Sequence, residues 1–265
     1  MSSINVTPLY EGTYSVGIDK LFKKINRNDP PHKGELKLSI NPFLIKDDTH
    51  TILFDAGMGD LLSEGSSIDT ILNNLEKQNV SELDVTDIFI SHLHFDHFSG
   101  LANRKDGYWD LTFPNARIYV SKGGWKKLNK YLHKQPEENQ DFIHYLESFA
   151  DLTFLPAEES NPIPQVKVKK IGGHTEFHQV LTYNHGDSRF IMAGDVIGRR
   201  IAINKNFEAK FDFEPKKSME MRNELKRKAC IEKYTIMAYH ETDHPLFNLT
   251  ESMGNGKNGY KIENL

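Results

Sequence analysis

The most constraining feature of the sequence is an apolar run that leads directly into a cluster of metal-binding residue types. Residues 88–100 read Ile-Phe-Ile-Ser-His-Leu-His-Phe-Asp-His-Phe-Ser-Gly. On a strand, side chains two positions apart lie on the same side, so His92 and His94 can converge on one metal ion. Asp96 and His97 are adjacent, so both can point inward only if the chain turns there. This spacing predicts two pairs of ligands, which is more than one ion needs from one loop.

The residue types in this cluster limit the metals that it can bind. Imidazole nitrogen and carboxylate oxygen are ligands for zinc, iron, manganese or cobalt. The chain has a single cysteine, Cys230, far from the cluster in sequence, which excludes a structural zinc site built on thiolates. A solvated surface loop is the alternative interpretation. It is disfavoured because the strand that leads into the cluster is apolar and should end in a buried rim.

One segment cannot complete two coordination shells, and three other segments offer further ligands. His174, Asp195 and His240 each follow an apolar run that has the composition of a strand. Glycine precedes His174 and Asp195, which allows the backbone to approach a neighbouring segment closely. Three such strand ends, together with the first cluster, reinforce one another as a single predicted site.

This combination of motifs resembles the metallo-β-lactamase superfamily. The resemblance rests on His92-x-His94-x-Asp96-His97 followed in order by His174, Asp195 and His240. The segment Leu53-Phe-Asp-Ala-Gly57 also resembles an early strand-end motif of that superfamily. The pattern spans about residues 40–240, and therefore most of the chain.

The resemblance implies an α/β fold, the αββα sandwich of two mixed β-sheets flanked by helices, with the metal ions at one end of the sheets. It implies that the first metal is bound by His92, His94 and His174. The second would be bound by Asp96, His97 and His240, with Asp195 bridging the two. Asp55 would orient one of the ligands from behind, as metal-bound imidazoles commonly require.

Hydrophobic periodicity predicts the elements of this fold. Strands are expected at residues 13–18, 36–45, 51–54, 87–91, 117–120, 152–155, 166–171, 180–183, 190–193 and 235–238. Helices are expected at residues 67–78, 124–133, 137–149 and 216–233. No long linker divides the chain, so residues 1–250 are predicted to form a single domain. Residues 251–265 are polar and rich in turn-forming residues, and are expected to form a loosely held tail.

Composition narrows the classes of partner. The chain has 265 residues, of which 38% are hydrophobic and 26% charged, with a formal net charge of −4. This balance offers no basic face for nucleic acid, and no window is apolar enough to span a membrane. The first residues do not resemble a signal peptide, and one unpaired cysteine suits a reducing compartment, so a cytoplasmic protein is expected. The oligomeric state is left open, with a homodimer as one alternative.

The predicted centre suggests a hydrolase. Two divalent ions, with zinc expected and iron, manganese or cobalt as alternatives, can share a water and lower its pKa so that hydroxide becomes the nucleophile. Asp96 and Asp195 are the candidate catalytic residues, because Asp96 could orient that nucleophile with its free oxygen. The expected substrate is a small ester or lactone. A thioester, as in glyoxalase II, or a phosphotriester is the alternative, and a non-hydrolytic metal-binding or di-iron redox protein is the alternative from another class.

Within the superfamily, the sequence most resembles the lactonase branch, in residues 91–97, in residues 113–120 and in the segment Asp212-Phe-Glu-Pro215. Two departures from that branch concern the substrate site. Several lactonases of the superfamily have a Tyr three residues after the bridging Asp, where this chain has Gly198. Small residues usually follow the third-segment His, but Glu176 and Phe177 occur here and should change the rim of the site. Candidate pocket residues are Phe95, Phe98, Trp109 and His178, with core packing as the alternative for the aromatic side chains. The basic stretch 222–228 is interpreted as a solvated helix face.

Overall fold

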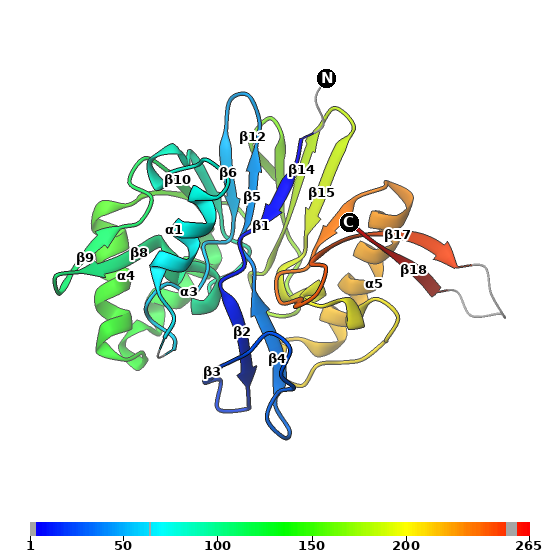
Figure 1. Cartoon of the computed structure of the whole chain (residues 1–265), viewed down its shortest axis with the longest axis horizontal. Coiled ribbons are helices and arrows are strands. Elements are labelled where there is room, and N and C mark those ends of the chain that lie inside the picture. Colours follow the sequence, from blue (N-terminus) through cyan, green and yellow to red (C-terminus); the bar gives the residue numbers. More distant parts are fainter. Residues whose placement is uncertain (1–3, 64, 253–258) are drawn as a thin grey trace.

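The computed structural model describes residues 4–63, 65–252 and 259–265, and its main body consists of two large sheets packed face to face (Figure 1). The first sheet has six strands. In spatial order, the last four are parallel to one another, and the second strand runs antiparallel to both of its neighbours. In spatial order they are β1 (Val6–Pro8), β5 (Phe43–Lys46), β6 (Thr51–Phe54), β7 (Asp87–Phe89), β10 (Arg117–Ser121) and β11 (Asp151–Leu155).

The second sheet has seven strands, which pair antiparallel except for the parallel pair β15 and β16. They are β12 (Ser160–Ile163), β13 (Val166–Lys170), β14 (Gln179–His185), β15 (Ser188–Met192), β16 (Thr235–Met237), β17 (Leu246–Ser252) and β18 (Gly259–Asn264). Both large sheets are therefore mixed.

Helices cover the outer face of each sheet. The first sheet is covered by α1 (Ile68–Glu76), α3 (Lys122–Lys130) and α4 (Glu137–Phe149), and the second by α5 (Pro215–Ile231) (Figure 1). β7 shows how this layering follows from the sequence. Ile88 and Ile90 pack with the helices, whereas Phe89 between them packs between the sheets, because successive side chains of a strand face opposite ways. The expected αββα sandwich is confirmed.

Two small sheets complete the described fold. One contains β2 (Gly12–Val16), β3 (Phe22–Ile25) and β4 (Leu36–Ile40), and the other contains β8 (Ala102–Lys105) and β9 (Tyr108–Leu111). The run 36–45, expected as one strand, is divided between β4 and β5. Asn41 lies at the division and donates hydrogen bonds to the carbonyl oxygens of Tyr239 and Glu241. The chain thus changes sheets beside His240.

The expectation of a loosely held tail is wrong for residues 259–264. These residues form β18, which pairs with β17 along its full length. Tyr260 and Ile262 pack against the apolar cluster beneath α5. Their alternation with polar residues gives a half-buried edge strand. Residues 253–258 of the predicted tail lie outside the described residues. Within the described chain, each helix is too short or too polar to cross a membrane.

Candidate metal centre

Four stretches of chain carry the predicted ligands to one end of the sandwich. His92 and His94 follow β7, and the chain then turns into the short helix α2 (Phe95–Phe98), which confirms the expected departure from strand geometry. His174 lies in the loop after β13, and Asp195 in a 3-10 turn after β15. His240 follows β16. The ligand atoms form two groups, and within each group they lie within 4.8 Å of one another.

The first group contains His92, His94, His174 and Asp195. His94 Nδ1 lies 3.0 Å from His92 Nε2 and 3.1 Å from His174 Nε2. Asp195 Oδ2 lies 3.1 Å from His174 Nε2. Two nitrogens that bind one zinc ion tetrahedrally at about 2.1 Å lie about 3.4 Å apart. The spacing of these nitrogens is therefore close to that of a metal site.

The second group contains Asp96, His97 and His240. The other oxygen of Asp195, Oδ1, reaches this group and lies 3.2 Å from His97 Nε2 and 3.0 Å from His240 Nε2. Asp96 Oδ2 lies 3.5 Å from each of the same two nitrogens. Asp195 therefore presents one carboxylate oxygen to each group.

Two buried atoms around the second group have no hydrogen-bond partner, one from His97 and one from the shared residue Asp195. These are His97 Nε2 and Asp195 Oδ1, although they lie close together. Buried polar atoms are almost always satisfied, so a pair of unsatisfied atoms requires an explanation. A cation between Asp96, His97, Asp195 and His240 would satisfy both. The donor set, with five imidazoles and two carboxylates over the two groups, fits a pair of divalent ions.

Neighbouring groups determine which ring nitrogen of four of the five histidines faces the site. His97 Nδ1 donates to Asp55 Oδ2 at 2.6 Å, and His174 Nδ1 donates to Asp212 Oδ1 at 2.7 Å. His240 Nδ1 donates to the carbonyl oxygen of Ser39 at 2.9 Å. His92 Nδ1 lies 3.1 Å from Ser91 Oγ. Each of these contacts leaves Nε2 free as a ligand, whereas His94 presents Nδ1.

Asp55 lies behind the second group, where the resemblance placed an orienting residue. It accepts hydrogen bonds from the backbone N–H and the hydroxyl of Ser91 as well as from His97. Its backbone has φ of 58°, an uncommon conformation for a residue other than glycine. Asp55 thus links the Ser91 segment to helix α2 at a strained position, a feature that is typical of functional sites.

The charges of the groups compensate one another. Burial acts to lower the pKa of His174, but Asp195 and Asp212 raise it to about 9. Burial raises the pKa of Asp195, but His240, His174 and His97 together hold it well below its usual range. Burial lowers the pKa of His92 and of His94 well below the usual value. The first group therefore offers two neutral imidazoles, His92 and His94, and an ionised carboxylate, the protonation states that metal ligation needs. His174 holds a proton because of its two carboxylate neighbours, and a metal ion bound at its Nε2 would displace that proton.

Two supporting residues were not identified as such from the sequence. Asp212, which orients His174, was noted in the sequence only as part of the lactonase-like segment Asp212-Phe-Glu-Pro215 and was given no role. Tyr239 stacks on His97 with ring centroids 4.1 Å apart, and its hydroxyl donates to the carbonyl oxygen of Asp96 at 2.7 Å. Its position directly before His240 was the one available signal.

The prediction of a solvated face at residues 222–228 is wrong at two positions. Arg222 and Lys226 are buried. Arg222 donates to the carbonyl oxygens of Val196 and Phe207, and Lys226 donates to that of Ile203. Both cations thereby satisfy backbone carbonyls in the irregular segment after Asp195. Buried charges of this kind are tolerated because each is hydrogen-bonded.

The four candidate pocket residues do not line the cavity beside the metal ligands. Phe98 is fully buried, and Phe95 and Trp109 pack with it around Phe142 in the core beneath the helices. His178 is also fully buried, and its Nε2 donates to the carbonyl oxygen of Ala193. Burial lowers the pKa of His178 to about 3, so it stays neutral. The short helix α2 turns the phenylalanines away from the metal face, which sequence spacing alone did not reveal.

The cavity beside the ligands has a volume of about 370 Å³ and is reached by His92, His94 and His174. Its other walls come from the residues that follow β7, from α3, from the loop that carries His174, and from Phe211 and Phe213. Glu176 and Phe177 contribute to the lining, as expected for the rim. Gly198 lies against His240, and its carbonyl oxygen accepts the backbone N–H of His240 at 2.8 Å.

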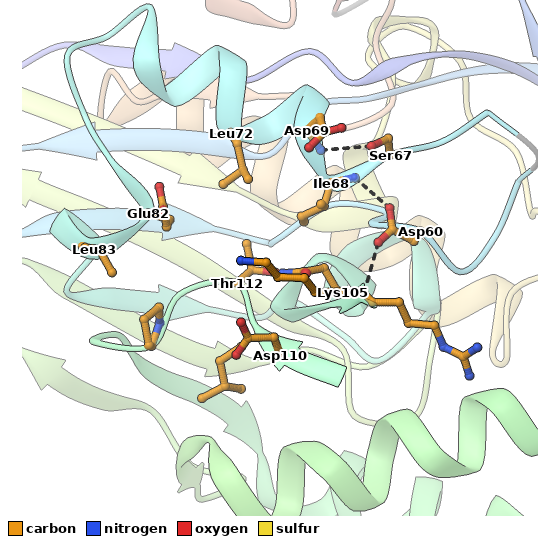
Figure 2. Close-up of a pocket in the computed structure, with 14 residues that line it drawn as sticks. Asp60, Ser67, Ile68, Asp69, Leu72, Glu82, Leu83, Lys105, Asp110 and Thr112 are labelled. Carbon is orange, nitrogen blue, oxygen red and sulfur yellow. Dashed lines mark hydrogen bonds between the residues drawn. The ribbon is translucent and has the colours of Figure 1, made fainter. Parts of the chain in front are cut away.

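A second cavity of about 640 Å³ lies away from the metal ligands, between α1 and the β8–β9 hairpin (Figure 2). Asp60 lies within it and accepts hydrogen bonds from the backbone N–H groups of Ile68 and Arg104. Both oxygens of this carboxylate thus already accept hydrogen bonds from the backbone nearby. None of the described metal-ligand groups lines this cavity.

Comparison with known proteins identifies the family and the fold. The sequence model of the metallo-beta-lactamase superfamily matches residues 37–237. No match was found among curated proteins. A probable metal-dependent hydrolase from Staphylococcus aureus is similar in structure, with a TM-score of 0.77 and 18% identity over 100% of this chain and 98% of its own.

Two further solved structures are similar. The hydrolase AbOPH, described as in the beta lactamase superfamily, has a TM-score of 0.78 and 23% identity over 100% of this chain and 95% of its own. The dizinc quorum-quenching lactonase AidC has a TM-score of 0.74 and 20% identity over 100% of this chain and 96% of its own. With the match to the family model over most of its length, the chain belongs to the metallo-beta-lactamase superfamily.

Proposed function

We propose that the protein is a metal-dependent hydrolase that uses two divalent ions, zinc in the first instance, to cleave a small ester or lactone. The observation that carries the proposal is the position of Asp195. Its two carboxylate oxygens lie about 3 Å from imidazole nitrogens of different ligand groups, Oδ2 at 3.1 Å from His174 and Oδ1 at 3.0 Å from His240. A carboxylate shared in this way supports two ions held side by side.

Each ligand residue has a defined part in this proposal. His92, His94 and His174 hold the first ion, Asp96, His97 and His240 hold the second, and Asp195 is shared. Two ions bound there would lower the pKa of a water towards neutrality and polarise the carbonyl group under attack. Asp96 faces the imidazoles through Oδ2, so its other oxygen is available to accept a hydrogen bond from the attacking water and orient it. Asp55 and Asp212 hold two of the imidazoles in the required orientation.

The cavity supports a small organic substrate. It lies against three of the ligands, and its other walls combine apolar and aromatic side chains with polar ones, as small-molecule sites do. The polar side chains besides the ligands are Ser121, Lys127, Gln135, Thr175 and Glu176. The similar structure of AidC, a dizinc lactonase, favours lactone or ester cleavage over the alternatives. Cleavage of thioesters or phosphotriesters and a di-iron redox role are the competing activities.

The test combines metal analysis with substrate profiling. Purified protein is analysed for bound metals, and hydrolysis of acyl-lactones, aryl esters, thioesters, phosphotriesters and β-lactams is measured before chelation, after chelation and after reloading with zinc. We expect about two zinc ions per chain and lactone or ester hydrolysis that chelation abolishes and zinc restores. A folded protein that binds no metal, or a metal-loaded protein that hydrolyses none of these substrates, would contradict the proposal.

A further inference from the structure

The cavity beside the metal ligands has a buried inner wall and a partly exposed outer wall. Ile90 and Ser121 line the cavity and are buried, and we call them its inner wall. Phe211 and Phe213 are 61% and 54% exposed, and together with Lys127 and Glu176 we call them its outer wall. Ordering an exposed side chain costs conformational entropy, so contacts with other groups are needed to hold it in one position. The contacts of the outer wall therefore determine how far the cavity extends.

Lys127 is the residue that links the parts of this wall. It lies on α3, and its Nζ is 2.8 Å from Glu176 Oε2 in the loop that carries His174. The same ammonium group lies 4.3 Å from the centre of the Phe213 ring, in cation–π geometry. The side chains of Lys127 and Glu176 are 39% and 41% exposed, so the pair lies at the surface of the cavity. Lys127 thus joins three segments that are distant in sequence.

Two of these segments are also attached to the metal centre. The backbone N–H of Phe213 donates to the carbonyl oxygen of His174 at 3.0 Å, and Asp212, next to Phe213, orients the His174 ring. Glu176 lies two residues after His174. The outer wall is therefore built from the same loops that position a ligand. A change in the wall alters the space next to the reacting bond.

A second contact fixes the other end of the helix against the same loop. The ring of Phe177 lies where a Cβ atom at Gly123 would be, at 2.2 Å, so the first turn of α3 can approach the loop only because residue 123 is glycine. This contact is apolar and closely packed. The Lys127 contacts are polar and half-exposed, and are consequently the weaker of the two links.

The lining decides which group this space accepts. Leu93, Leu128, Tyr131 and Phe177 provide apolar surface, and the polar lining residues other than the ligands and the Lys127–Glu176 pair are uncharged: Ser121, Gln135 and Thr175. A charged substituent would therefore lose hydration without gaining an oppositely charged partner. The charge of Lys127 is already compensated by Glu176. An uncharged apolar chain is the occupant that this surface favours.

From these contacts we propose that Lys127 is a specificity-determining residue. Its pairing with Glu176 and Phe213 closes the outer wall, so the cavity accepts an uncharged apolar chain of limited length on the acyl side of the scissile bond. This inference rests on the proposed hydrolysis of esters or lactones. It predicts that longer acyl chains are disfavoured relative to shorter ones as long as the pair is intact.

The test compares chain-length profiles in matched variants. The metal-loaded wild type, Lys127→Met, Glu176→Gln and the charge-swapped double variant Lys127→Glu/Glu176→Lys are assayed with p-nitrophenyl esters from acetate to decanoate. Lys126→Met is the control, because Lys126 is exposed on the same helix and does not line the cavity. We expect kcat/KM for the long esters, relative to the short ones, to rise roughly two- to fivefold in each single variant, the factor that the energy of a partly exposed ion pair allows.

The charge swap should return the profile towards that of the wild type, because it restores the ion pair. Profiles that are the same in Lys127→Met, Lys126→Met and wild type would overturn the inference. Melting curves establish whether each variant is folded. If Lys127→Met does not fold, Glu176→Gln tests the same ion pair independently.

A binding measurement separates failure of this inference from failure of the proposed function. Calorimetric titration of the metal-loaded proteins with alkanoates from butanoate to decanoate measures how binding affinity depends on chain length, without turnover. If neither esters nor lactones are hydrolysed but Lys127→Met alone changes the dependence of affinity on chain length, the proposed function fails, and the control of chain length by Lys127 stands as a property of binding. If esters are hydrolysed but neither profile differs from that of Lys126→Met, the inference fails and the function stands. If there is neither hydrolysis nor a change in binding, both are wrong.

Discussion

Asp55 and His97 form a fully buried pair, with Asp55 Oδ2 2.6 Å from His97 Nδ1 and neither side chain exposed to solvent. The same carboxylate accepts hydrogen bonds from the backbone N–H and the hydroxyl of Ser91, the residue before His92. One side chain thus orients a ligand of the second group and anchors the segment that carries the first. This relationship leads to the first prediction.

Asp55→Asn should lower metal affinity about 10- to 100-fold, the usual effect of removing a group that orients a metal ligand. The amide keeps the shape of the side chain, but it replaces one accepting oxygen by a donor, so the contacts with Ser91 and His97 cannot all persist. Titration of metal against a competing chelator measures the effect. Asp87→Asn is the control, because Asp87 is buried in the neighbouring strand, where it accepts from Tyr119. Equal affinities in the two variants would argue against the orienting role.

His94→Ala and Asp195→Ala should each lower kcat/KM by at least about a thousandfold, because ligands and nucleophile act as one unit. We expect both variants to remain folded, since the sheets and helices do not depend on these side chains. Steady-state kinetics and circular dichroism measure the two effects. His133→Ala, which changes an exposed histidine outside the site, should leave activity unchanged. Substantial activity in Asp195→Ala would remove the basis for a shared carboxylate.

Arg222→Met should destabilise the protein by about 3 kcal/mol, because the buried guanidinium donates two charge-assisted hydrogen bonds. One acceptor is the carbonyl oxygen of Val196, the residue directly after Asp195. Loss of this hydrogen bond should also disturb the position of Asp195, so the metal content should fall as well. Urea denaturation and metal analysis measure the two effects. Arg227→Met, an exposed position on the same helix, is the matched control. A variant as stable as this control would show that the loop holds its position without Arg222.

Glu11 predicts a pH dependence of stability. The Glu11 side chain is buried, and its Oε2 accepts the backbone N–H of Met58. Burial raises its pKa from 4.5 to about 8. The folded state therefore binds a proton that the unfolded state has released, and the free energy of unfolding falls as pH rises from 4.5 to about 8. Each unit of pKa shift corresponds to about 1.4 kcal/mol.

Glu11→Gln should remove this contribution, so the variant should gain stability relative to wild type as pH rises through that window. Denaturation at a series of pH values measures it. Glu208→Gln, at an exposed position, is expected to follow the wild type. Parallel stability curves for wild type and Glu11→Gln would show that the Glu11 carboxyl does not titrate in this range.

Much of the fold followed from local pattern. The helix at residues 137–149 and the strand at 51–54 have the expected bounds, because both lie in runs with clear periodicity between turn-forming residues. The tail strand β18 was missed because its few apolar side chains become half-buried only when β17 lies beside it. The sequence of residues 259–264 does not by itself indicate that β17 lies beside them.

The candidate ligands could be named from the sequence because a histidine or aspartate at the end of an apolar strand is conspicuous wherever the strand goes. Spacing along the chain indicated that His92 and His94 form one pair and that Asp96 and His97 require a turn. What only the tertiary structure decided is which atoms face each other across segments: Asp195 between the two groups, Asp212 behind His174, and Lys127 against Glu176. These contacts join residues that are far apart in sequence, so their distances and burial depend on how the sheets, helices and loops pack and not on any local pattern.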